Sequence, residues 1–189
     1  RELTKNLLAE SFKELLIKGS FDKITIKMIT DQAGVIRPTF YNYFQDKYEV
    51  MEWLLWEDVF KEVSELMEQE RGMESLKLLF RKFEEDKTYY EKVFEVTGQN
   101  SFEEMLYGQI FNMEEILVKH HPLKHLSNMP HVDEKVFLEF HAISLVNGLK
   151  YWLIRESKNI SAGDAMEFYQ YMMSHSILDL LDIENTEKK

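Results

Sequence analysis

Apolar residues recur at helical spacing in successive segments of this 189-residue chain. The first segment predicted to be helical ends at Gly19. The others cover residues 24–33, 37–44, 46–69, 73–85, 87–97, 101–120, 133–157 and 161–181. A break at Gly98-Gln99-Asn100 and a loop at 121–132, which holds two of the three prolines, separate the later segments. We therefore expect an all-α protein with about nine helices.

Residues 24–47 carry the clearest local signals in the chain. Thr25 is placed to cap a short helix, and Gly34 suits the left-handed conformation that ends one. Pro38 fits only the first turn of a new helix, whose inward face holds Phe40 and Phe44. Two short helices joined by a tight turn with a glycine describe a helix-turn-helix, whose second helix enters the major groove of DNA.

The same stretch resembles the DNA-binding domain of the TetR/AcrR family of transcriptional regulators. The matching positions are Gly19, Phe21, Thr25, Ile29, Ala33-Gly34-Val35, Thr39-Phe40-Tyr41, Tyr43-Phe44 and Asp46-Lys47. The resemblance implies a helix-turn-helix domain over residues 1–47 and a larger helical domain for effector binding and dimerisation over residues 48–189. One departure is Ile36, where the family usually has a small capping residue, so entry to the second helix must depend on Pro38 or on a shifted start.

DNA binding needs side chains that reach base edges and others that hold phosphates. We expect base contacts from Arg37, Thr39 and Asn42, which follow or flank Pro38 at the start of the second helix. The expected phosphate contacts are Thr25, Lys27, Tyr41, Tyr43 and Lys47, of which the cap, the tyrosine and Lys47 are implied by the resemblance. The alternative for Tyr41 and Tyr43 is that they only pack the domain. A dimer would then read a pseudo-palindromic operator in double-stranded DNA.

The last two predicted helices have more apolar surface than one domain needs, which suggests a helix–helix dimer interface. The alternative is an ordinary core that is buried on two sides. The resemblance favours a homodimer, because family members typically dimerise through a four-helix bundle made by these helices. The residues predicted for the interface are Leu145, Gly148, Trp152, Phe168, Met172 and Ile177.

The resemblance also implies a pocket for an unknown small-molecule effector, enclosed by the body helices. Such pockets are mostly apolar with a few polar groups. The candidate lining residues are Trp53, Tyr89, Phe94, Phe102, Tyr107, Phe111, Phe137, His141 and Asn147. Stripes of aromatic residues and methionines are more often simply core, and this alternative applies to each of them.

Composition narrows the remaining possibilities. The net charge is −11, but residues 1–48 hold eight basic and six acidic residues (+2), so the remainder carries −13. An acidic body with a mildly basic end suits a protein that touches DNA through one end. The chain has no cysteine, which is compatible with a cytoplasmic protein, and it has no signal peptide pattern or apolar run long enough to span a membrane. It starts at Arg1, so we expect a trimmed start.

No known catalytic motif is present, and we expect neither an enzyme nor a cofactor. The histidines at 120, 121, 125 and 131 lack cysteine or suitably spaced carboxylate partners, so no metal site is predicted.

The expected function is a transcriptional repressor that a small-molecule inducer releases from its operator. The alternative is an activator whose body docks a protein partner. The segments Asp86–Tyr90, Gly98–Phe102 and Gly148 with Trp152 before Ser161 resemble a subgroup that includes an activator of dihydroxyacetone kinase genes.

Overall fold

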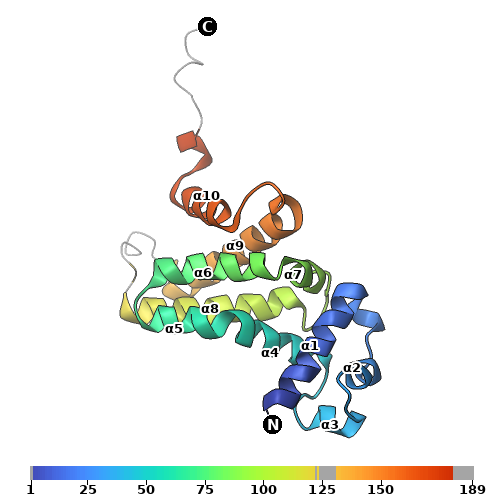
Figure 1. Ribbon diagram of the computed structural model, residues 1–189. Helices are drawn as coiled ribbons and strands as arrows, with labels where there is room; N and C mark the ends of the chain where they lie inside the picture. Colours follow the sequence, from blue (N-terminus) through green and yellow to red (C-terminus); the bar gives the residue numbers. More distant parts are fainter. Residues whose placement is uncertain (1, 122, 124–130, 181–189) are drawn as a thin grey trace, which may run out of the picture.

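The computed structural model describes residues 2–121, 123 and 131–180 of the chain. Every regular element in these residues is helical, which confirms the predicted all-α class. Three helices, α1 to α3, form a small group at one end of a larger helical body (Figure 1). We call the first group the head. Among the described residues, no helix has the length and hydropathy that crossing a membrane requires.

The head is built from α1 (Glu2–Lys18), the 3-10 turn η1 (Phe21–Lys23), α2 (Ile26–Gln32) and α3 (Arg37–Tyr41). Each of these short elements has one apolar face, so together they can enclose only a small core. The side chains that fill this core are no more than 1% exposed, and they are Leu8, Phe12, Leu16, Ile29 and Phe40.

The predicted long helix after the head is continuous, but it contains a π-helical turn. It consists of α4 (Lys47–Leu55), the π turn η2 (Trp56–Phe60) and α5 (Lys61–Glu68). Asp46 caps its start, because the carboxylate accepts from the N–H groups of Tyr48 and Glu49 at 2.8 and 3.0 Å. The helix is buried on two sides as predicted, and it runs from the head into the body (Figure 1).

The centre of the body is formed by α6 (Gly72–Glu85), α7 (Lys87–Val93) and α8 (Phe102–His120). In Figure 1, α5, α6 and α8 lie side by side, while α7 lies next to α1. Ser101 caps α8 as predicted, since its hydroxyl accepts from the N–H of Glu104. The Glu104 carboxylate accepts from the N–H of Asn100, one residue before the position that a capping box uses. α7 ends at Val93, earlier than the predicted residue 97.

Two longer segments complete the described chain: α9 (Glu134–Tyr151) with the π turn η4 (Trp152–Glu156), and α10 (Ala162–Ser174) with the 3-10 turn η5 (Ile177–Leu180). α9 packs on α8, and α10 packs on α6 (Figure 1). The predicted helix over 161–181 was too long. His175 is extended, and Ser176 and Asp179 exchange hydrogen bonds that begin the separate turn η5.

Candidate nucleic-acid interface

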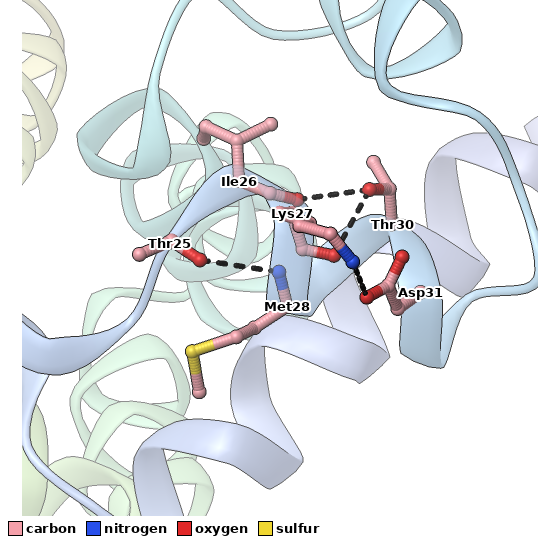
Figure 2. A network of polar contacts seen from close by, with 6 residues as sticks. All are labelled: Thr25, Ile26, Lys27, Met28, Thr30 and Asp31. Carbon is pink, nitrogen blue, oxygen red and sulfur yellow. Dashed lines mark hydrogen bonds and ion pairs between the residues drawn. The ribbon is translucent and has the colours of Figure 1, made fainter.

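The start of α2 is fixed by Thr25, as the sequence predicted. Its backbone is extended, and its hydroxyl accepts a hydrogen bond of 3.2 Å from the N–H of Met28 (Figure 2). Ile29, one turn into the helix, is fully buried and anchors α2 to the head core. Thr25 itself is exposed, so a phosphate could approach it from solvent.

A second threonine acts on the other side of α2. Thr30 is 2% exposed, and its hydroxyl donates to the carbonyl oxygens of Ile26 and Lys27, each 3.1 Å away (Figure 2). The exposed ammonium of Lys27 lies 2.5 Å from a carboxylate oxygen of Asp31. A phosphate that binds Lys27 must therefore compete with Asp31, but an exposed ion pair of this kind is weak.

The turn between α2 and α3 depends on Gly34. Its φ of +68° lies in the left-handed region, which costs glycine little and strains other residues. This turn brings the N–H of Val35 to the carbonyl of Thr30, 3.0 Å away, and closes the end of α2. α3 therefore leaves α2 at a fixed angle.

α3 begins without a side-chain cap. Ile36 occupies the cap position with extended backbone and makes no capping hydrogen bond, and Pro38 lies in the first turn. The helix covers only Arg37–Tyr41, and it is held by Phe40 and Phe44, whose ring centroids are 5.7 Å apart. Pro38 thus lies where the first of the two routes that the sequence left open requires it.

The outer surface of α3 carries the predicted base-contacting groups. Arg37, Pro38, Tyr41 and Asn42 are exposed, and Thr39 is half-buried. Arg37 donates to the Tyr41 hydroxyl at 3.1 Å, and its guanidinium lies 5.7 Å from the centre of that ring. The contact pre-orients Arg37 along the helix surface, so this guanidinium and the Asn42 amide are offered from the same short segment.

Lys47 already has partners within the head. Its ammonium donates to the carbonyl oxygens of Phe21 and Ile24 at 2.7 and 3.2 Å, and it lies 4.2 Å from the centre of the Phe21 ring. Burial lowers the pKa of Lys47, while the charge of Asp22 acts in the opposite direction. Lys47 therefore ties the start of α4 to η1, and its phosphate contact stays a prediction.

Tyr43 is half-buried and packs against the head core, whereas Tyr41 is 49% exposed. Trp53, predicted to line an effector pocket, instead packs on Phe44 at 5.9 Å where the head meets the body. The ammonium of Lys5 lies over the rings of Phe44 and Trp53, 5.2 and 4.9 Å from their centres.

Three of the seven predicted pocket aromatics fill the core of the body. Tyr89, Phe94 and Phe102 are at most 3% exposed, and together with Phe83 and Tyr90 they form one aromatic cluster. The other candidates are more open. The rings of Tyr107 and Phe111 are tilted against each other with centroids 6.0 Å apart, and Phe137 stacks on His141. Asn147 is exposed, and its amide donates to a carbonyl oxygen of its own helix.

The hollows in the described part of the body include two that no predicted pocket residue lines. One is an apolar cavity of about 240 Å³ between α9 and α10, lined by residues that include Phe80, Gly148, Trp152 and Tyr169. The other is a charged, open groove of about 900 Å³ between α5, α6 and the start of α10.

A polar chain links α8, α9 and α10 inside the body. His141 Nδ1 lies 2.6 Å from Oε1 of Glu114, and His141 Nε2 lies 3.4 Å from the hydroxyl of Tyr169. Burial raises the pKa of Glu114, although the hydrogen bond and charge of His141 act against this rise. Burial also raises the pKa of Tyr169, and the charge of Glu114 adds to that effect.

The predicted dimer residues divide into two groups. Leu145 and Trp152 are 1% and 4% exposed within the protomer, so in this conformation they have almost no surface to offer to a second copy. Gly148 faces Tyr169 of α10 inside the same chain. Phe168, Met172 and Ile177 are exposed, although Ile177 lies on η5 and not on the predicted helix.

Sequence comparisons decide the family. Residues 12–53 match the model of the bacterial regulatory proteins of the tetR family, and residues 70–173 match that of a transcriptional regulator C-terminal region. The chain belongs to the TetR family. It is therefore a transcriptional regulator with a DNA-binding helix-turn-helix, as the sequence resemblance implied, and family members of this kind are not enzymes.

One curated relative and two solved structures are similar to this TetR-family chain. The transcriptional activator DhaS of the dhaKLM operon of Lactococcus lactis is 29% identical over 92 residues, which cover 49% of this chain and 49% of that protein. The solved structure of a dihydroxyacetone kinase operon activator DhaS has a TM-score of 0.63 at 24% identity, covering 97% and 98% of the two chains. A TetR-family regulator from Syntrophomonas wolfei has a TM-score of 0.67 at 21% identity, covering 96% and 98%. These structures share the fold.

Some residues of this TetR-family protein were missed by sequence reasoning. Lys5, Thr30 and Glu114 all make contacts that join different turns or helices. Glu114 had one available signal, since it falls on the apolar side of α8 next to Met113. The predicted absence of metal binding concerned His125 as well, which lies outside the described residues.

Proposed function

We propose that this TetR-family regulator binds a pseudo-palindromic operator as a homodimer through its head, residues 1–47, and that residues 48–189 form the regulatory and dimerisation body. The observation that carries the proposal is the surface of α3. Arg37 and Asn42 are exposed on a helix whose angle is fixed by Gly34 and whose inner face is held by Phe40. A short, anchored helix with a forked donor and an amide suits direct reading of base edges.

The apolar surface of α9, η4 and α10 supports the homodimer. A second copy is the expected partner, because a two-fold operator requires two heads related by symmetry. Large apolar side chains on this surface are 38–69% exposed, and such patches mark interaction sites. They are Val136, Phe137, Phe140, Ile143, Tyr151, Ile154, Phe168, Tyr171, Met172 and Met173.

Two candidate modes of regulation follow from different observations. Repression relieved by a small inducer is supported by the 240 Å³ apolar cavity, which is large enough for a small apolar molecule. Activation with a docked protein partner is supported by the similarity to DhaS, which is described as an activator, and by the closed aromatic core around Phe83 and Phe102.

The first test is binding to a duplex from the region upstream of the protein's own gene, against a scrambled duplex of equal length and base composition. Both are measured at one moderate salt concentration, because salt alone changes the affinity strongly. We expect a preference of about a thousandfold or more for a duplex that holds the operator. Arg37→Ala should lose most of this preference, while Arg81→Ala on the body serves as the matched control.

The sign of regulation is tested with a reporter driven by that upstream region. Deletion of the gene should raise reporter output if the protein is a repressor and lower it if the protein is an activator. Equal weak binding to both duplexes, with no effect of Arg37→Ala, would contradict the head as the reader of that region.

A further inference from the structure

One lysine joins the head to two parts of the body. The ammonium of Lys13, on α1, lies 3.0 Å from Oδ2 of Asp58 and also pairs with the carboxylate of Asp86. Asp58 lies within the π turn η2 of the long helix, and Asp86 lies where α6 gives way to α7. The Lys13 side chain is only 11% exposed, so this is a sheltered contact and not a solvated surface pair.

The charges at this junction do not balance. Burial lowers the pKa of Lys13, but the hydrogen bonds and charges of Asp86 and Asp58 outweigh burial and raise it. Lys13 therefore stays positive at neutral pH. One cation faces two carboxylates, which leaves capacity on the carboxylates for further hydrogen-bond donors.

Two such donors are buried beside this junction. The ammonium of Lys13 lies 5.2 Å from the centre of the Tyr89 ring, and the Tyr89 and Tyr90 rings contact each other at 5.2 Å. Within the described residues, neither tyrosine hydroxyl has a hydrogen-bond partner. Lys13 contacts both carboxylates and lies over the Tyr89 ring, which packs on Tyr90, so the two tyrosines lie beside the ion pairs. Burial raises the pKa of both hydroxyls, and the negative charges of Asp58 and Asp86 add to the rise.

The π turn supplies a way for Asp58 to change partners. A π turn holds one more residue per turn than an α-helix needs, and such turns are frequent at functional sites. Conversion of η2 to α-helical geometry would rotate the side chains on one side of it by about 100° relative to the other. Such a rotation would draw Asp58 away from Lys13 and break this ion pair between α1 and the long helix.

We propose that Lys13 is the positioning residue that sets the head against the body, and that Asp58 and Asp86 exchange Lys13 for the hydroxyls of Tyr89 and Tyr90 when the head changes position. The proposal rests on the proposed function only in naming residues 1–47 as the DNA-binding head. It gives the body a two-state element through which an event in the body can move α1.

The chain has no cysteine, so two cysteines introduced at chosen positions would be the only sites that a thiol-reactive spin label modifies. Lys23 on η1 and Glu115 on α8 are exposed and suit labels on head and body. The doubly labelled full-length chain is diluted into unlabelled chain, and pulsed electron paramagnetic resonance then reports the distance between labels within one chain. We expect one distance population in the parent chain and a second population in Lys13→Met, which keeps the length of the side chain but removes its charge.

Lys82→Met is the matched control. It breaks the ion pair of Lys82 with Glu62, 2.7 Å, which joins α6 to α5 inside the body and has a similarly sheltered lysine. This variant should keep the single population. A second test combines Lys13→Met with Tyr89→Phe and Tyr90→Phe, which removes the alternative donors and should abolish the second population.

The proposal is overturned if Lys13→Met lowers the melting temperature but keeps the single distance population of the parent chain, because Lys13 would then be only a stabilising contact. If Lys13→Met does not fold, Asp86→Asn takes its place, with the same expected and contradicting results. The distance measurement needs no DNA. A shifted distance in a chain that fails to bind the upstream duplex would support Lys13 as the positioning residue and contradict the DNA assignment alone.

Discussion

The head and the body of this protein are both helical, but their surfaces differ. In the head, the large apolar side chains that remain exposed are spread over different elements, such as Leu3 on α1, Met28 on α2 and Tyr41 on α3. In the body they concentrate on α9, η4 and α10, where Phe140 and Phe168 are 69% and 58% exposed. The head is thus suited to a polar partner such as DNA, and the body to an apolar one.

The two regions also differ in how their structure is encoded. Local signals specify the head: a capping threonine, a left-handed glycine and a proline each act within a few residues. The body depends on contacts between residues far apart in the chain, such as Phe83 with Phe102. Changes to the body core should therefore have larger effects on stability than changes to the caps of the head.

The largest effect on stability is expected from Phe83→Ala. Phe83 is fully buried and touches Tyr90, Phe94 and Phe102, so its loss leaves a cavity in the aromatic cluster. We expect the free energy of unfolding to fall by about 3–5 kcal/mol, measured by chemical denaturation. Phe83→Leu should cost clearly less. A cost below about 1 kcal/mol would mean that the cluster contributes no more than a surface contact.

This contrast explains how much the sequence could predict. The cap by Thr25, the turn at Gly34 and the start at Pro38 were predictable because each depends on neighbouring residues. The role of the predicted pocket residues could not be derived in this way and stays a prediction, because an aromatic side chain such as Phe102 fits a core and a ligand site equally well until its neighbours are known. Trp152 likewise looked available for a dimer, but its indole donates to the carbonyl of Ile160 and its ring meets Phe80.

The next largest effect concerns the apolar surface of the body. Phe140→Asp places a carboxylate on α9 at a position that is 69% exposed in the protomer. If a second copy covers this surface, the dimer dissociation constant should rise about a hundredfold or more, since burying an unpaired charge is costly. Sedimentation velocity over a range of concentrations measures the change.

Leu3→Asp is the control for this prediction, because Leu3 is 72% exposed on the head. It should leave the dissociation constant unchanged. Equal behaviour of the two variants would remove the contrast between head and body and would place the interface elsewhere.

A smaller effect is expected from Lys47→Ala. If Lys47 contacts a phosphate, its loss should weaken binding to all DNA sequences and reduce the slope of log affinity against log salt by about 1. If Lys47 acts only through the carbonyl oxygens of Phe21 and Ile24, the head should lose stability while the slope stays the same. Lys82→Ala, which breaks a body ion pair, controls for the loss of one positive charge.

Thr25→Ala tests the local encoding of the head. It removes the hydrogen bond to the N–H of Met28, and we expect a loss of about 1 kcal/mol in the free energy of unfolding. Thr97→Ala, at an exposed body position, is the control and should change it by less than about 0.5 kcal/mol. An equal effect of both variants would show that the cap adds nothing beyond the change of residue type.

The smallest expected effect is a pH dependence that belongs to the body alone. Burial raises the pKa of Glu114 in the folded protein above its unfolded value of about 4.3, so the folded state binds this proton more tightly. Its contribution to stability is therefore fully present below the unfolded pKa and is lost as the pH rises through the raised value. The glutamine of Glu114→Gln cannot ionise. The free energy of unfolding of the parent chain relative to this variant should therefore fall between pH 4 and neutrality, by an amount set by the difference between the folded and unfolded pKa of Glu114.

Denaturation of both proteins across this pH range measures the difference, and Glu115→Gln, at the exposed neighbouring position, is the control. The opposite trend would mean that the hydrogen bond of His141 to Glu114, 2.6 Å long, outweighs burial. In that case the chain from Glu114 through His141 to Tyr169 would join α8, α9 and α10 most strongly when the carboxylate is charged. The sign of the change in relative stability with pH therefore decides whether the polar chain stabilises or destabilises the packing of the body helices at neutral pH. The head has no buried carboxylate among its described core residues, so we expect no such pH dependence from it.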